Sequence, residues 1–145
     1  MFLKGVEIML NGYKIICEAM QLVNVPFIVH EHEPRRGSKH YDVRFLDPRD
    51  PKILHSFAAP SNFPDTAQGK TVLAKTRDHD PRWLKLKSYR LKTVDEGKAE
   101  IKMATHKYFE ITFNGKLLNG FYKLFKMSNT QRDDRWLLIK SKEKT

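Results

Sequence analysis

Cysteine is nearly missing from this chain of 145 residues, since Cys17 is the only one. A lone cysteine cannot close an internal disulfide, and it excludes a zinc site built from two or more thiolates. This usage is typical of proteins in a reducing compartment. We therefore expect a cytoplasmic protein.

Long apolar runs are missing as well. The charged residues Lys4, Glu7, Lys14 and Glu18 interrupt the apolar residues near the N-terminus, so no stretch there is long enough to span a bilayer. The same stretch lacks the clean apolar core and the small-residue cleavage site of a secretion signal. We expect a soluble protein that is not secreted and has no membrane partner.

Acidic residues are outnumbered, because 17 Asp and Glu stand against 27 Lys and Arg and give a formal net charge of +10. In a basic domain with aromatic residues, this balance favours a polyanionic partner, most simply nucleic acid; a charge that serves only solubility is the alternative. The length and the 40% of hydrophobic residues suit one globular domain. We expect a monomer. The chain lacks the lysine motif for nucleotidyl transfer, so it should not join nucleic-acid strands by itself.

Most of the chain alternates between polar and apolar residues, which is typical of β-strands. The predicted strands cover residues 27–33, 39–45, 52–59, 71–76, 83–91, 98–104, 108–113, 117–127 and 136–139. Many short strands at close spacing predict a mainly β fold, an antiparallel β-barrel that is closed or nearly closed. Pro81 biases Asp80 towards an extended conformation, so we expect no helix at this proline.

The N-terminal segment shows a different period. From Val6 to Leu22, apolar residues recur at helical spacing, at Val6, Met9, Leu10, Tyr13, Cys17 and Met20. This pattern predicts an amphipathic helix that ends near Asn24, although Gly12 argues against it. We expect a helical addition over residues 1–25 and a β-barrel domain over residues 26–145.

The strand at 39–45 carries the first candidate site. His40, Asp42 and Arg44 fall on one face of it, and neighbouring members of this row are about 6–7 Å apart. An imidazole and a carboxylate can ligate a divalent cation, and a guanidinium grips phosphate oxygens. We interpret the row as a metal–phosphate site; a solvated charged face is the alternative.

The preceding strand supplies further imidazoles on one face, His30 and His32. The basic turn 34–38 separates it from the strand 39–45, so the two strands are predicted to form a hairpin. If they pair, His32 lies near His40 or Asp42. Spacing alone does not decide between His32 and His30 as the metal ligand.

These residues resemble a known signature. The segment 27–32, the Arg35-Arg36 turn and the segment 40–44 together resemble the 3′-phosphoesterase domain of bacterial and archaeal DNA ligase D. Three further stretches agree in order and approximate spacing: Ser56–Pro60, Lys70–Pro81 with its Asp78-His79 pair, and Gly120–Leu124 followed by Trp136–Lys140. The resemblance covers about residues 26–142.

The resemblance implies a metal-dependent enzyme of DNA repair with a β-barrel fold and a site in a polar groove. Such enzymes remove a 3′-phosphate, or a 3′-terminal ribonucleoside and then its phosphate, from DNA or RNA–DNA primer ends. It implies manganese, with zinc or cobalt as alternatives, bound by His32, His40 and Asp42. Arg44 and His79 match phosphate contacts, and a DNA ligase or polymerase is the implied partner in trans.

The chemistry of these side chains agrees with such a site. Two imidazoles and one carboxylate, that of Asp42, leave coordination positions open for water and phosphate. Arg44 would offset charge on the transferring phosphoryl group, and His79 would donate a proton or a hydrogen bond to an oxygen. The nucleic-acid backbone would meet rim cations, and a base would stack on an aromatic ring; the candidates are Arg35, Arg36, Lys70, Lys75 and Trp83.

The sequence also departs from the family. Ser61 stands where a lysine is usual, Trp83 stands where a tyrosine is usual, the Gly-Tyr-Gly loop is absent from 92–105, and residues 1–25 are unrelated. The metal cluster is therefore kept while part of the substrate contacts is changed. The alternative function is a non-catalytic β-barrel that binds nucleic acid beside a DNA ligase.

Overall fold

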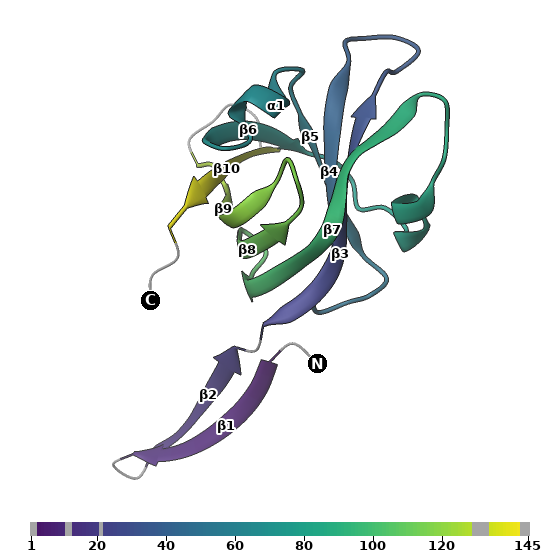
Figure 1. The fold of residues 1–145 in the computed structure, drawn as a ribbon. Coiled ribbons are helices and arrows are strands. Elements are labelled where there is room, and N and C mark those ends of the chain that lie inside the picture. The colour runs from purple at the N-terminus through teal and green to yellow at the C-terminus, as the bar shows by residue number, and fades with distance from the viewer. Residues whose placement is uncertain (1–2, 11–12, 21, 129–133, 143–145) are drawn as a thin grey trace.

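The body of the protein is a closed antiparallel β-barrel in the computed structural model (Figure 1). The structure describes residues 3–10, 13–20, 22–128 and 134–142. Within these ranges eight strands form the barrel in the hydrogen-bonded order β10-β6-β5-β4-β3-β7-β8-β9, and β9 pairs with β10 to close it. The strands are β3 (Val23–His32), β4 (His40–Leu46), β5 (Leu54–Ala59), β6 (Lys70–Lys75), β7 (Leu91–Ala104), β8 (Tyr108–Asn114), β9 (Asn119–Lys126) and β10 (Arg135–Ser141). The predicted mainly β fold with a closed barrel is confirmed.

Alternate residues of the strands fill the barrel. Val29 on β3 and Val43 on β4 belong to this core and are 0% and 1% exposed. Burying such a side chain contributes roughly 1.5–3 kcal/mol to stability. Because successive side chains of a strand point to opposite faces, the neighbouring His30, Asp42 and Arg44 lie on the outer face of the barrel wall.

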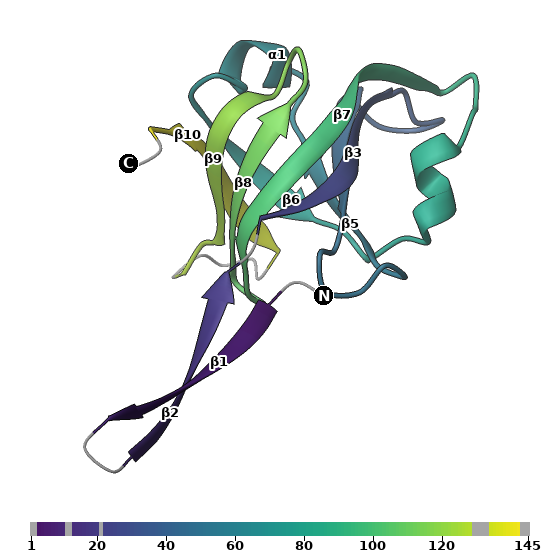
Figure 2. The same ribbon diagram turned by 60° about the horizontal axis from the view of Figure 1, so that its bottom comes forward.

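Residues 3–10 and 13–20 form the two strands of a β-hairpin and not the predicted helix. β1 (Leu3–Leu10) and β2 (Tyr13–Met20) pair antiparallel in a sheet of their own. Figures 1 and 2 show this hairpin extending from the end of the barrel at which β3 begins. The helical addition predicted over residues 1–25 is therefore wrong.

The sequence of this hairpin explains the error. Its apolar residues fit a helical period, but Val6, Ile8 and Leu10 also recur with a period of two. β-Branched residues favour strands, and the register runs without interruption from Leu3 opposite Met20 to Leu10 opposite Tyr13. Pairing between the two segments, which a single-helix interpretation ignores, decides in favour of strands.

The connection between β6 and β7, residues 76–90, lies against the outer face of the barrel, where His79 forms an isolated bridge with Leu54. Its middle is the 3-10 helix η1 (Pro81–Lys85), which contacts β3 and is seen beside the barrel in Figure 2. We predicted no helix at this proline and a strand over 83–91, and both predictions are wrong.

The helix η1 begins at Pro81, directly after Asp80, for a local reason. Asp80 is extended, as expected before proline, and its side chain accepts a hydrogen bond from the backbone N–H of Arg82. Pro81 takes the first helical position, where a missing N–H has no cost.

The other short helix, α1 (Phe63–Thr66), buries Phe63 in the core. In the described ranges no helix is long and apolar enough to cross a membrane.

Candidate metal centre

Strand pairing gathers the predicted metal ligands. In the β3–β4 ladder His32 stands opposite His40, and His30 stands opposite Asp42. All four side chains belong to the same face of the two strands, because directly paired residues share a face. The predicted hairpin, with its two rows of polar residues side by side, is therefore present on the outer wall of the barrel.

Three of these side chains converge. His32 Nδ1 lies 3.1 Å from His40 Nε2, and it lies 3.3 Å from Asp42 Oδ2. His40 Nε2 lies 3.2 Å from Asp42 Oδ1. One candidate donor atom from each residue can be chosen so that all three lie within 4.8 Å of one another. The metal centre, as we name the group His32, His40 and Asp42, thus presents two nitrogens and one carboxylate to a common point.

The state of the Asp42 carboxylate supports a cation there. Asp42 is 4% exposed, and its Oδ2 has no hydrogen bond within the part of the chain that the structure describes, although His32 Nδ1 and Arg44 Nη2 each lie 3.3 Å away. These contacts are electrostatic, since their geometry does not make them hydrogen bonds. A buried carboxylate oxygen without a hydrogen bond is costly, and coordination of a divalent cation would satisfy it. The residues present therefore fit manganese, zinc or a similar ion.

Arg44 is buried beside the metal centre and is only 3% exposed. Its Nη1 donates to His30 Nδ1 at 2.7 Å, and its Nε donates to Ser56 Oγ at 3.2 Å. Its guanidinium carbon lies 4.9 Å from the ring centre of Trp83. Burial lowers the pKa of Arg44, and the Asp42 carboxylate opposes that shift. The guanidinium is thus held in one orientation before any ligand arrives.

His30 holds Arg44 and does not join the three converging ligands. Burial, followed by the charge of Arg44, lowers the pKa of His30 to about 4, so the imidazole is neutral near pH 7 and its Nδ1 accepts from the guanidinium. Its Nε2 has no hydrogen bond among the described residues. Of the two histidines that the spacing left open, the geometry brings His32 to the other ligands.

The connection 76–90 completes the site from above the barrel wall. His79 stacks on Trp83 with ring centres 4.4 Å apart. Burial, then the charges of Arg44 and Arg77, lower the pKa of His79. A cavity of about 260 Å³ lies between this connection and the wall and is lined by His32, His40, Asp42, Arg44, His79 and Trp83. Six predicted site residues therefore share one cavity.

Three further residues line the same cavity without having been predicted: Ser56, Thr76 and Arg77. Ser56 stands opposite Arg44 in the β4–β5 ladder, so a predicted register would have indicated it. Thr76 and Arg77 come from the connection, whose path no periodicity reveals.

The predicted rim cations separate into two groups. Arg35 and Arg36 are exposed on the turn that joins His32 to His40, beside the metal centre. Lys75 faces the barrel interior, 5.2 Å from the ring centre of Phe57, and Lys70 begins β6 about 16 Å further along the strand. Neither lysine lines the cavity of the metal centre.

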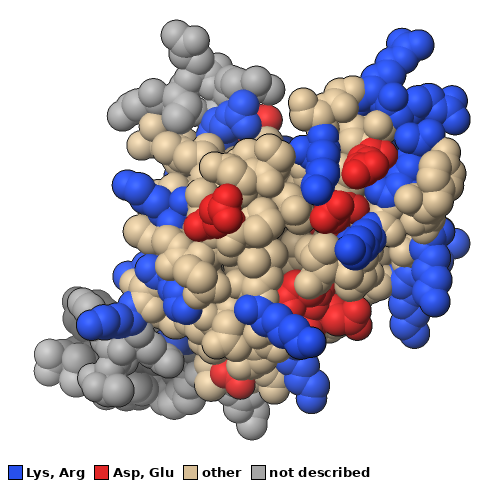
Figure 3. Space-filling model, turned by 45° about the horizontal axis from the view of Figure 1, so that its top comes forward, with Lys and Arg blue, Asp and Glu red and all other residues tan. Residues whose placement is uncertain are grey.

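Positive charge extends beyond the cavity. Exposed cations lie on the β3–β4 turn and on the 76–90 connection, at Arg35, Arg36, Lys39, Arg82, Lys85 and Lys87. Figure 3 shows Lys and Arg outnumbering Asp and Glu on the face it draws and gathering at its right edge. Such a surface suits the phosphate backbone of a nucleic acid.

No protein-family model matches the chain, and no curated protein matches it. The resemblance to the phosphoesterase domain of DNA ligase D therefore stays a prediction. The function of the chain has to be inferred from the metal centre, the cavity around it and the basic surface beside it.

Proposed function

We propose that this protein is a metal-dependent phosphoesterase that removes the 3′-phosphate from DNA or RNA–DNA ends. One observation carries the proposal: two imidazoles, a buried carboxylate and a preset guanidinium line the same cavity. His32, His40 and Asp42 would hold manganese, with zinc or cobalt as alternatives. The resemblance to the DNA ligase D domain supports the same activity.

Each residue has a physical role in such a reaction. A bound divalent cation polarises a phosphoryl oxygen and lowers the pKa of a bound water. Arg44 would balance charge on the phosphoryl group, and its fixed contacts with His30 and Ser56 reduce the reorganisation that this needs. The lowered pKa of His79 favours the neutral imidazole at pH 7, which suits a hydrogen bond to a phosphate oxygen better than donation of a full proton.

The surroundings support nucleic acid as the substrate class. The exposed cations of the β3–β4 turn and the 76–90 connection would hold the strand without sequence preference. Removal of a 3′-terminal ribonucleoside is part of the implied activity. The proposed setting is cytoplasmic DNA repair, with a monomer acting before a separate ligase or polymerase.

The test is turnover of a primer–template that carries a 3′-phosphate, with manganese, magnesium or zinc added in turn. We expect manganese-dependent release of phosphate that is abolished in Asp42→Ala. Asp65→Ala, which changes an exposed carboxylate on α1, is the matched control and should keep full activity. Wild-type turnover by a folded Asp42→Ala protein would refute the assignment.

One observation favours a second candidate, a non-catalytic nucleic-acid-binding barrel. The Trp83 ring already lies against both His79 and Arg44, at the position where the family has a tyrosine hydroxyl. This candidate predicts salt-sensitive binding of single strands and primer ends with no turnover under any metal. No binding at low salt would exclude it.

A further inference from the structure

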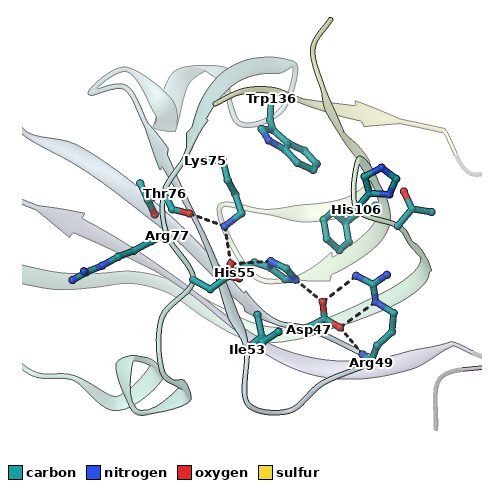
Figure 4. A pocket seen from close by; sticks show the side chains of 12 residues that line it. Asp47, Arg49, Ile53, His55, Lys75, Thr76, Arg77, His106 and Trp136 are labelled. Carbon is teal, nitrogen blue, oxygen red and sulfur yellow. Dashed lines mark hydrogen bonds and ion pairs between the residues drawn. The ribbon is translucent and has the colours of Figure 1, made fainter. Parts of the chain in front are cut away.

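A second and larger cavity opens at one end of the barrel. Its volume is about 400 Å³, which lies in the usual range for small-molecule sites. We name it the barrel-mouth pocket; Ile53, Phe109 and Trp136 supply its apolar and aromatic wall, and Arg49 and His106 stand at its rim (Figure 4). The volume and the aromatic wall suit a flat ring.

Apart from Arg77, the lysine, arginine and aspartate side chains that line this pocket are already paired with one another. Asp47 accepts from His55 Nε2 at 2.6 Å and from Arg49 Nη2 at 3.1 Å. Lys75 Nζ donates to Asp78 at 2.9 Å and to the Thr76 carbonyl at 2.7 Å. A free anion would therefore gain little attraction from these paired groups, and Arg77 remains as the cation available to a phosphate. Fixed polar groups next to aromatic edges suit an uncharged ring that carries hydrogen-bonding atoms.

One polar atom of this wall has no hydrogen bond. His55 Nδ1 is buried and lacks a hydrogen-bond partner among the residues described, and Asp78 Oδ1 lies 3.5 Å away. His55 is held between Phe45 and Phe109, with ring centres 5.3 Å and 5.1 Å from its own. The imidazole is therefore fixed, with hydrogen-bonding capacity still available.

The barrel-mouth pocket adjoins the metal centre. Thr76 and Arg77 line both cavities. The next two residues serve different cavities, because Asp78 contacts Lys75 in the barrel-mouth pocket and His79 stacks on Trp83 in the other. Arg77 is exposed and makes no hydrogen bond or ion pair within the described part of the chain, so it is available to a phosphodiester that passes from one cavity to the other.

We propose that the barrel-mouth pocket binds a nucleobase of the strand whose terminal phosphate lies at the metal centre, with Arg77 on the phosphodiester between them. This inference rests on the proposed function. A base can enter such a pocket only when it is unpaired and unstacked. The substrate class is therefore a single-stranded or frayed 3′ end, and a fully paired blunt end is a poorer ligand.

The first test measures binding in EDTA, where nothing is turned over. Two 5′-labelled single strands with a 3′-phosphate are compared by fluorescence anisotropy; they differ only in whether the last two nucleotides carry bases or are abasic. We expect the abasic strand to bind about tenfold more weakly, as for the loss of a stacked base. Equal affinities would overturn the proposal.

Variants locate the effect in the pocket. Ile53→Trp should fill the pocket and remove the preference for bases, while the backbone bonds of Ile53 to Asp47 and Asp50 keep the turn in place. His106→Ala removes an exposed rim ring and should reduce the preference, whereas Lys107→Ala on the same turn should leave it unchanged. If Ile53→Trp does not fold, the preference for bases measured with His106→Ala decides whether the base binds in this pocket. A preference that is unchanged in every folded pocket variant would place the base elsewhere and overturn the proposal.

The two proposals fail in different ways. Manganese-dependent release of phosphate with equal affinity for both strands would overturn the base pocket alone. A tenfold preference for bases that Ile53→Trp removes, without turnover under any metal, would overturn the phosphoesterase activity alone.

Discussion

His30 Nδ1 lies 2.7 Å from the Arg44 guanidinium, and both side chains are buried on the outer wall of the barrel. The imidazole lone pair is the acceptor, so His30 orients the guanidinium towards the cavity of the metal centre. This hydrogen bond explains how the Arg44 guanidinium can be buried and still face the cavity of the metal centre.

We expect His30→Leu to weaken this arrangement. The guanidinium loses an acceptor, which should lower the free energy of unfolding by about 1–3 kcal/mol in urea denaturation. Under the proposed function, kcat should fall more than KM rises, because Arg44 stabilises mainly the transition state and a misoriented guanidinium loses that effect. His30→Gln, which keeps an acceptor oxygen, should restore much of both; equal defects in the two variants would contradict the role of the lone pair.

The metal centre predicts stabilisation by a divalent cation. At a manganese concentration one hundred times its Kd, the free energy of unfolding should rise by about 3 kcal/mol. Thermal denaturation should then shift upward by about 5–10 °C. Asp42→Asn should show no shift, and Asp65→Asn on α1 should shift like the wild type. A shift in Asp42→Asn equal to that of the wild type would mean that the cation binds elsewhere.

Asp47 predicts a loss of stability in acid. Burial raises the pKa of its carboxyl, but hydrogen bonds from His55 and Arg49 outweigh burial and hold the pKa well below the ordinary value of 3.8. The ionised Asp47 therefore contributes fully to the free energy of unfolding above about pH 4. This contribution is lost as the pH falls further, because Asp47 then binds a proton in the unfolded chain but not in the folded chain. Asp47→Asn should be less stable than the wild type by about 1.5–3 kcal/mol at pH 7, and the difference should narrow at pH 3.

The measurement is urea denaturation of both proteins at pH 7, 5 and 3. Asp65→Asn serves as the control, since an exposed carboxylate should change stability little at any of these values. A difference between Asp47→Asn and the wild type that stays constant from pH 7 to pH 3 would show that the carboxylate charge is not what stabilises this turn.

Asp95 fixes the loop between β8 and β9. Its buried carboxylate accepts from the backbone N–H groups of Lys116, Leu117 and Leu118 at 2.8, 3.0 and 2.8 Å. Asp95→Ala should lower the free energy of unfolding by about 2–3 kcal/mol, because three backbone donors lose their acceptor and the bond from Leu118 is buried. Urea denaturation measures the loss.

A second substitution tests the same loop from the other side. A Cβ on Gly115 would overlap the Asp95 carboxylate, so Gly115→Ala should also destabilise the protein. Gly69→Ala is the matched control, since its Cβ would meet only the Thr66 carbonyl at an ordinary 3.8 Å. Equal stabilities of the two alanine variants would contradict the close approach at Gly115.

The alternation of polar and apolar residues was enough to predict which residues share a face of a strand. The period of two placed His40, Asp42 and Arg44 in one row and His30 and His32 in another. The alternation is local, so it can be read without knowing any partner. The same local reading failed for residues 3–20, where apolar spacing fits a helix and a strand equally and only pairing of β1 with β2 decides.

Which of these rows is buried, and which segment covers it, depends on how the whole chain folds. The connection 76–90 brings His79 and Trp83 over the outer wall, and this cover buries Arg44 and leaves its guanidinium a single orientation. The barrel-mouth pocket likewise exists because strands far apart in the chain end at the same rim. Such contacts depend on register and on barrel closure, which are properties of the whole chain and leave no period in any one segment.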